Sequence, residues 1–229
     1  MAKVAPKLLV IGGTGFIGRH LLQTAVNLGW DVTSASLHPL SSENRVENVK
    51  YLQLNIIYRQ ECEVLLRHKF EYVVNLVGYI DHRSYANGGR SLIETHFTAL
   101  QNLIDVVLRD DLRSFVQIGS SDEYGNAHAP QMENLRESPI SPYSLGKVAC
   151  THFLQMLHRT EGFPSTTLRL FLTYGPGQAS QRFLPQIIKG CLEGKPFPTS
   201  TGEQFRDFCF VKDSVQAIVR TLQTPSAHG

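Results

Sequence analysis

Short apolar runs alternate with amphipathic stretches of helical length along nearly the whole chain. The runs are rich in β-branched and aromatic residues and lie at residues 7–11, 31–36, 49–54, 72–76, 114–118 and 166–170. The helical stretches lie at residues 17–28, 91–109 and 143–161. This alternation is typical of a parallel sheet whose crossover helices cover both faces. The sequence therefore predicts an α/β chain with a doubly wound sheet, and its 229 residues suffice for one large domain and a small annex.

Composition and charge argue against several partners and sites. The formal net charge is only +2 and no basic run is present, so neither nucleic acid nor an anionic membrane surface is expected as a partner. The first apolar run is too short for a signal sequence or a membrane span. The four cysteines lie far apart, which is typical of reduced thiols in a cytoplasmic protein. The nine histidines show no metal-ligand spacing, so no metal site is predicted.

A glycine cluster at residues 12–18 lies between the first apolar run and the first helical stretch. Glycines in this context allow a tight turn, close approach of the backbone to a pyrophosphate, and close packing of helix on strand. The free N–H groups at the start of the helix favour an anion. The sequence therefore predicts a dinucleotide cofactor here, contacted by Gly12, Thr14, Gly15, Phe16, Ile17 and Gly18.

The end of the second strand bears on the choice between NAD and NADP. A carboxylate there binds the 2′-hydroxyl of NAD, whereas a small or basic environment admits the 2′-phosphate of NADP. Ser36 falls at this position, Asp31 lies at the wrong end of the strand, and Glu43 lies in the loop beyond. The nearest arginine, Arg45, does not adjoin Ser36. Both cofactors remain open.

Tyr143 and Lys147 are four residues apart at the start of a predicted helix, so their side chains share one face. A lysine cation favours the phenolate of a nearby tyrosine, and the pair is then usable as a general acid and base. Ser120 and Ser121 follow the fifth strand, at the edge where parallel sheets bind ligands. We therefore predict an active site at this edge.

Five motifs share their order with one known family. They lie at residues 12–18 (GGTGFIG), 120–125 (SSDEYG), 141–147 (SPYSLGK), 169–176 (RLFLTYGP) and 206–213 (RDFCFVKD). Together they resemble the extended short-chain dehydrogenase/reductases, the NAD-dependent epimerase/dehydratase group that acts on nucleotide sugars. The resemblance covers essentially the whole chain. It implies a Rossmann-type dinucleotide-binding domain over residues 1–175 and a substrate-binding region over residues 176–229, from which a strand and helix return to the first domain. Because family members extend further, this second region is expected to be truncated.

The resemblance also implies roles for the residues of the site. Tyr143 would exchange a proton with a sugar hydroxyl, and Lys147 would bind the nicotinamide ribose and lower the pKa of the tyrosine. Ser121 would bind the reacting oxygen, with Ser120 as the neighbour that could replace it. Asp122 and Glu123 would be the acid and base of a 4,6-dehydration, or they would only cap a loop.

Further contacts follow from the same resemblance. Cofactor contacts are expected at the ends of the third and fourth strands, from Asn55, Ile56, Leu76, Val77 and Gly78. Arg182 and Arg206 are candidate substrate-binding cations, with Arg206 in the position of a pyrophosphate contact. Leu172 replaces an asparagine that commonly contacts the sugar.

The function predicted first is an NAD(P)-dependent nucleotide-sugar epimerase or dehydratase. An NADPH-dependent keto-sugar reductase and a non-catalytic cofactor-binding module remain as alternatives. We also expect a homodimer through helices 91–109 and 143–161, because family members pair these helices. The apolar Leu100, Leu103, Ile104, Val107 and Leu108 of the first of them exceed what one sheet face can cover.

Overall fold

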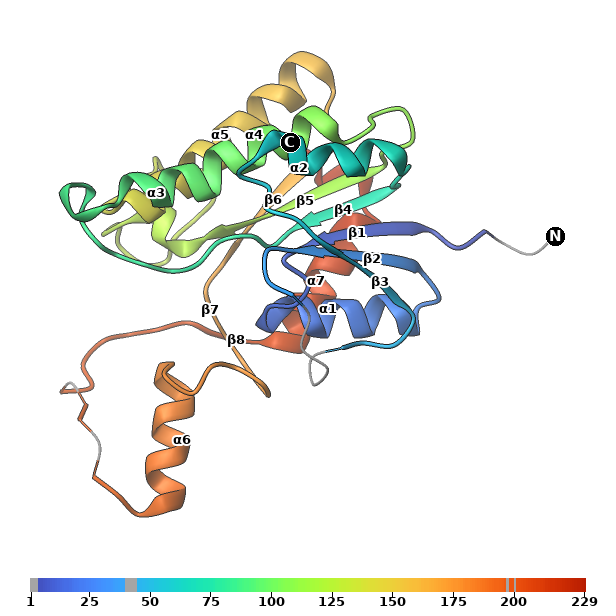
Figure 1. Ribbon diagram of the computed structural model, residues 1–229. Helices are drawn as coiled ribbons and strands as arrows, with labels where there is room; N and C mark the ends of the chain where they lie inside the picture. Colours follow the sequence, from blue (N-terminus) through green and yellow to red (C-terminus); the bar gives the residue numbers. More distant parts are fainter. Residues whose placement is uncertain (1–3, 40–44, 197, 200) are drawn as a thin grey trace.

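The computed structural model describes residues 4–39, 45–196, 198–199 and 201–229, so Glu43 lies outside the described residues. Its centre is a parallel sheet of six strands in the order β3-β2-β1-β4-β5-β6 (Figure 1). The strands are β1 (Lys7–Ile11), β2 (Asp31–Ser36), β3 (Val49–Gln53), β4 (Tyr72–Asn75), β5 (Ser114–Ser120) and β6 (Ser165–Leu170). The chain winds outward from β1 in one direction to β3 and then in the other direction to β6. The predicted doubly wound sheet is confirmed.

Helices cover both faces of this sheet (Figure 1). One face carries α1 (Phe16–Asn27) and α7 (Val211–Leu222), and the other carries α2 (Arg59–Cys62), α3 (Arg90–Ile93), α4 (Ala99–Val106) and α5 (Pro142–Glu161). The alternation of side chains along β1 divides the core accordingly. Leu8 and Val10 pack with α1 and α7, whereas Leu9 and Ile11 pack with α4 and α5. Because both faces are covered, β1 has no polar side of its own.

The helical stretch predicted at residues 91–109 consists of α3, a π-helical turn (Glu94–Thr98) and α4. Its apolar side chains are covered within the chain. Leu100, Leu103, Ile104 and Val107 are at most 7% exposed, and Leu108 is half-buried. The sheet and α5 together enclose Leu100, Leu103, Ile104 and Val107 in one core, so these four residues need no partner chain to cover them.

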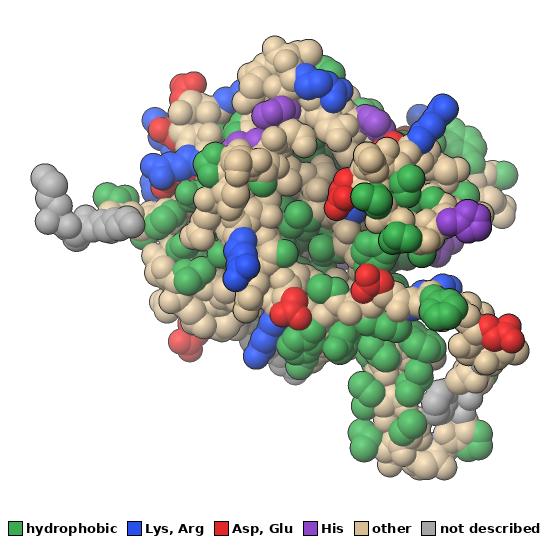
Figure 2. Space-filling view, turned by 180° about the vertical axis from the view of Figure 1, so that it is seen from behind, with side chains coloured by type: hydrophobic (Ala, Val, Ile, Leu, Met, Phe, Trp, Pro, Cys, Tyr) green, Lys and Arg blue, Asp and Glu red, His purple; other side chains and the backbone are tan. Residues whose placement is uncertain are grey.

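A smaller region extends from the main body (Figure 1). In it, β7 (Leu172–Tyr174) pairs in parallel with β8 (Phe208–Phe210), and α6 (Phe183–Glu193) lies between them in sequence. The chain then returns through α7 to the main sheet. Hydrophobic side chains gather over α6 (Figure 2), where Leu192 is 83% exposed. The predicted boundary between the two domains, after residue 175, falls in sequence between the paired strands β7 and β8. This boundary stays a prediction.

Within the described part of the chain, no helix combines the length and apolar character that crossing a membrane requires.

Candidate active site

The glycine turn joins β1 to α1. Gly12 adopts a positive φ of 81°, and its carbonyl accepts the Gly15 N–H at 3.1 Å. A Cβ at Gly18 would lie 2.5 Å from the Gly12 oxygen, so Gly18 permits the close packing of α1 on the turn. A Cβ at Gly15 would meet only that same oxygen, at 3.3 Å, and otherwise faces open space. Because α1 has neither a side-chain cap nor an acidic residue in its first turn, its N–H groups remain available to an anion.

The ends of β2, β3 and β4 lie beside this turn. The Ser36 hydroxyl accepts a hydrogen bond from the Thr14 N–H at 3.4 Å, so the predicted adenosine-side residue adjoins the glycine turn. The Asn55 side-chain oxygen accepts from the Ile57 N–H at 3.1 Å and so stabilises its own turn. Asn102 of α4, which sequence reasoning missed, donates to the Ile56 carbonyl at 3.0 Å. Leu76, Val77 and Gly78 follow β4 directly, and Leu76 and Val77 are half-buried.

Tyr143 and Lys147 lie in the first two turns of α5. Ser141 caps this helix by accepting from the Ser144 N–H at 3.1 Å, and Pro142 occupies the first helical position. Tyr143 and Lys147 are each only 4% exposed. The Lys147 ammonium donates to the Ile118 carbonyl of β5 at 2.7 Å. The structure thus brings the predicted pair to the carboxyl end of β5.

The pKa values of this pair reflect burial. Burial raises the pKa of Tyr143, the Ser120 hydroxyl partly offsets this through a hydrogen bond, and the charges of Asp122 and Glu123 raise it further. Desolvation of the phenolate is the largest of these influences, and the lowering of the tyrosine pKa by Lys147 stays a prediction. Burial likewise lowers the pKa of Lys147.

The structure brings Ser120 to Tyr143. Ser120 is the last residue of β5, and its hydroxyl reaches the phenol while accepting the Asp122 N–H at 3.1 Å. Ser121 begins the following 3₁₀ turn and is half-buried. The structure thus relates Ser120 to the phenol, and the role expected for Ser121 stays a prediction.

The adjacent carboxylates differ in placement. Glu123 has no exposed surface, and its oxygens accept hydrogen bonds from the Ser120 N–H at 2.9 Å, the Thr151 hydroxyl at 2.8 Å and Arg169 Nε at 2.9 Å. These contacts support the alternative that Glu123 caps the turn after β5, and its acid/base role stays a prediction. Asp122 is half-buried, and its carboxylate lies 3.9 Å from the imidazole of His82.

The two candidate arginines lie in the smaller region. Arg182 is the N-cap residue of α6, and its charge is near enough to Tyr143 to lower the pKa of the phenol slightly. Arg206 is exposed just before β8 and donates to its neighbour's carbonyl, that of Phe205, at 2.8 Å. The structure thus relates Arg182 to the phenol, whereas the pyrophosphate contact of Arg206 stays a prediction.

His96 is a site residue that sequence reasoning missed. It lies in the π-helical turn, is 3% exposed, and meets the ring of Tyr143 edge to face with centroids 5.1 Å apart. Glycines make room for it, since a Cβ at Gly78 would lie 2.0 Å from its ring and one at Gly146 would lie 3.2 Å from its Cβ. Neither nitrogen of the imidazole has a hydrogen-bond partner of ordinary geometry among the described residues, although the Tyr79 backbone is close enough to interact with the ring.

Burial, and next the charge of Lys147, lower the pKa of His96 to about 3. The imidazole is therefore neutral at physiological pH. Gly78 and Gly146 were the sequence signals of the space that His96 occupies. Among the described residues, no group of three histidine, cysteine or acidic side chains is arranged to hold a metal ion.

The cofactor cradle fits a dinucleotide by its own geometry: an uncapped helix N-terminus, open space at Gly15, and a buried ammonium against the carboxyl-terminal part of β5. Comparisons with known proteins agree. The family model described as NAD dependent epimerase/dehydratase family matches residues 8–229.

Curated relatives cover nearly the whole chain. The uncharacterised UDP-glucose epimerase YtcB of Bacillus subtilis is 29% identical over 238 residues, covering 97% of this chain and 74% of that protein. The dTDP-glucose 4,6-dehydratase of Haemophilus influenzae is 27% identical over 236 residues, covering 92% of this chain and 69% of that protein.

Solved structures show the same architecture. The UDP-N-acetylglucosamine 4-epimerase of Methanobrevibacter ruminantium M1 matches with a TM-score of 0.85 at 25% identity, covering 96% of this chain and 74% of that one. The UDP-glucuronic acid 4-epimerase of Bacillus cereus, in complex with UDP-glucuronic acid and NAD, has a TM-score of 0.84 at 26% identity, covering 95% and 73%. A dinucleotide cradle, a buried tyrosine–lysine pair and a match over almost the entire sequence thus coincide, and the chain belongs to the NAD-dependent epimerase/dehydratase family of enzymes.

Proposed function

We propose that this enzyme uses NAD to move a hydride at a sugar carbon of a nucleotide sugar, with epimerisation at that carbon as the net reaction. The observation that carries the proposal is the cluster of Ser120, Tyr143 and Lys147 at the carboxyl edge of the sheet. The names of the relatives, which include UDP-glucose and UDP-N-acetylglucosamine epimerases, support the substrate class.

The chemistry divides between the cofactor and the chain. Bound NAD supplies the hydride acceptor and then the hydride donor. Tyr143 moves a proton to or from the sugar hydroxyl, and Ser120 binds the same oxygen so that the proton transfer is aligned. Lys147, one helical turn from Tyr143, holds the nicotinamide ribose and favours the phenolate once the cofactor is in place.

Epimerisation is favoured over 4,6-dehydration because of Glu123. Elimination of water needs a second acid and a second base beside the tyrosine. Both oxygens of Glu123 are engaged within the protein, so only Asp122 of the two adjacent carboxylates remains open to a substrate.

The test uses UDP-glucose and UDP-N-acetylglucosamine, with the 4-epimer and enzyme-bound NADH measured as products. Tyr143→Phe should lower turnover by about 10²–10⁴, the range for loss of a positioned acid or base, and leave folding and NAD affinity unchanged. Tyr72→Phe is the matched control, because Tyr72 is the first residue of β4 and so lies at the amino end of that strand, away from the carboxyl ends where the site is formed. Near-normal turnover in Tyr143→Phe would exclude Tyr143 as the catalytic acid.

The same preparation separates an epimerase from a keto-reductase. An epimerase regenerates its NAD in every turnover and should retain it through purification, whereas a reductase releases oxidised cofactor each time. Cofactor extracted from natively purified protein should therefore be NAD in near-stoichiometric amount. Recovery of empty protein that turns over only with added NADPH would favour the reductase.

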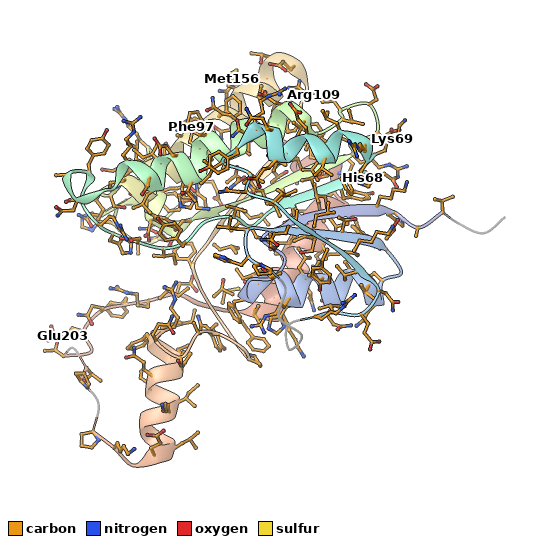
Figure 3. All side chains as sticks on the ribbon, in the orientation of Figure 1. His68, Lys69, Phe97, Arg109, Met156 and Glu203 are labelled. Carbon is orange, nitrogen blue, oxygen red and sulfur yellow. The ribbon has the colours of Figure 1, made fainter. Side chains whose placement is uncertain are left out.

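We further propose a homodimer through the outer face of the α4 and α5 layer. Phe97 and Phe153 are only partly covered and meet edge to face with centroids 5.7 Å apart. Met156 is 38% exposed, and Figure 3 shows it with Phe97 in the helical layer above the sheet.

All four cysteines are free thiols, which supports the expected cytoplasmic location.

A further inference from the structure

Glu123 connects three elements that surround the tyrosine–lysine pair. One carboxylate oxygen accepts from the backbone N–H of Ser120 at the end of β5. The other accepts from Thr151 of α5, one turn beyond Lys147, and from Arg169 of β6. Because the carboxylate has no exposed surface, these three hydrogen bonds stabilise its charge in place of water.

Arg169 anchors this carboxylate from the outside. Its guanidinium pairs with both Glu123 and Glu137, and lies over the ring of Tyr124 at 4.9 Å from the centroid. Glu137 in turn contacts His152 at 3.1 Å. Glu123 therefore cannot swing toward a substrate without breaking a half-buried ion pair.

The strand end is shaped to admit this carboxylate. A Cβ at Gly119 would lie 2.4 Å from the Glu123 Oε1 atom and 3.2 Å from the Cγ of Arg169. Gly119 thus leaves the space in which Glu123 turns back to the Ser120 N–H. The same turn places the Ser120 hydroxyl at Tyr143, so the position of Ser120 depends on Glu123.

Glu123 also acts on Lys147 through charge. The Lys147 ammonium is buried against the Ile118 carbonyl, and this desolvation favours loss of its proton. The charges of Cys150 and Glu123 act in the opposite direction. Burial raises the pKa of Cys150 to about 12, so at neutral pH Cys150 is an uncharged thiol. Of these two groups, Glu123 is the one that forms an ion pair, with Arg169.

We propose that Glu123 is a positioning residue: its buried carboxylate holds Ser120 against Tyr143 and is a counter-charge of the Lys147 ammonium. This inference rests on the proposed function, in which Ser120, Tyr143 and Lys147 form the site. Glu123 itself contacts no substrate. Its removal should therefore change how the site titrates and turns over, beyond any change in stability.

The test compares Glu123→Gln with Glu137→Gln. Each variant removes one carboxylate from the same arginine, but only the first also removes a partner of Ser120 and the counter-charge of Lys147. The pH at which Lys147 loses its proton is followed by NMR on protein with labelled lysine, with the signal assigned by its absence in Lys147→Met. This readout does not depend on turnover.

In Glu123→Gln, Lys147 should lose its proton at a lower pH than in the wild type, because an opposite charge near the ammonium is gone. The value of kcat should also fall at alkaline pH before that of the wild type does. In Glu137→Gln both properties should stay as in the wild type. An unchanged Lys147 titration in folded Glu123→Gln overturns the proposal, as does an equal change in both variants.

If Glu123→Gln does not fold, Glu123→Asp decides, because it keeps the charge and withdraws it by one methylene. The proposal requires a smaller downward shift of the Lys147 titration together with a lower kcat, and is overturned if neither changes. Failure of the proposed function would look different. Wild-type protein would then neither retain NAD nor convert a nucleotide sugar, whatever the Lys147 titration shows.

Discussion

His96 should make the stability of this protein fall when the solution is acidified. In the folded chain its pKa is lowered from 6.5 to about 3, first by burial and then by the charge of Lys147. In the unfolded chain the imidazole has its ordinary pKa near 6.5. Between these two pH values the unfolded state binds a proton that the folded state does not. The contribution of His96 to the unfolding free energy is therefore fully present above pH 6.5 and is lost as the pH falls toward 3.

The size of the effect follows from this difference. Each pH unit below 6.5 costs about 1.4 kcal/mol, so acidification to pH 5 should remove about 2 kcal/mol of unfolding free energy through His96 alone. At pH 5 the folded imidazole is still neutral, because that pH lies well above its folded-state pKa of about 3. This loss is a substantial fraction of the stability of an ordinary domain.

The assay is urea unfolding at pH 7 and pH 5 for the wild type and for His96→Asn. The Asn variant cannot titrate, so its loss between the two pH values should be smaller than that of the wild type by about 2 kcal/mol. His128→Asn is the matched control, because His128 is exposed in the folded chain, and it should lose as much as the wild type. Equal losses for wild type and His96→Asn would refute the reasoning, as would an NMR signal of a protonated His96 imidazole at pH 5.

Two further predictions concern the cofactor turn and the helical layer. Gly15→Val should fold normally but lose NAD affinity in calorimetry, because the new side chain occupies the open space at the turn. Gly18→Val should instead lower the temperature of the unfolding midpoint, because its Cβ would lie 2.5 Å from the Gly12 oxygen. Normal NAD affinity in Gly15→Val would contradict this assignment of the turn. The wild type should sediment as a dimer at micromolar concentration and Met156→Asp as a monomer with unchanged NAD content, whereas a monomeric wild type would contradict the interface.

Much of the fold could be predicted from local pattern. The alternation of apolar runs and amphipathic stretches is set by neighbours in sequence, and a run such as residues 7–11 requires cover on both faces wherever it lies. The spacing of Tyr143 and Lys147 is likewise local, because four residues make about one helical turn. These features depend on backbone geometry alone, and the structure reproduces them.

The identity of the serine at Tyr143 depended on where one strand ends. Successive residues of a strand point to opposite faces, and β5 continues through Ser120, two residues beyond the predicted boundary at residue 118. No local signal distinguished these two neighbouring serines. The capping of the next turn by Glu123, which stops the strand at Ser120, is a contact that only the folded chain displays.

Burial decided the remaining differences. The sequence shows that Glu123 and His96 are ionisable and that the residues of α4 are apolar. Whether these side chains contact water in the folded chain depends on partners that are distant in the sequence. Arg169 lies 46 residues from Glu123, and Gly146 lies far along the chain from the His96 that it accommodates. The sequence by itself determined which elements form and which residue types meet at the edge of the sheet. Only the tertiary structure decided which of those side chains lose water and which partners replace it, because both depend on contacts between residues distant in the chain.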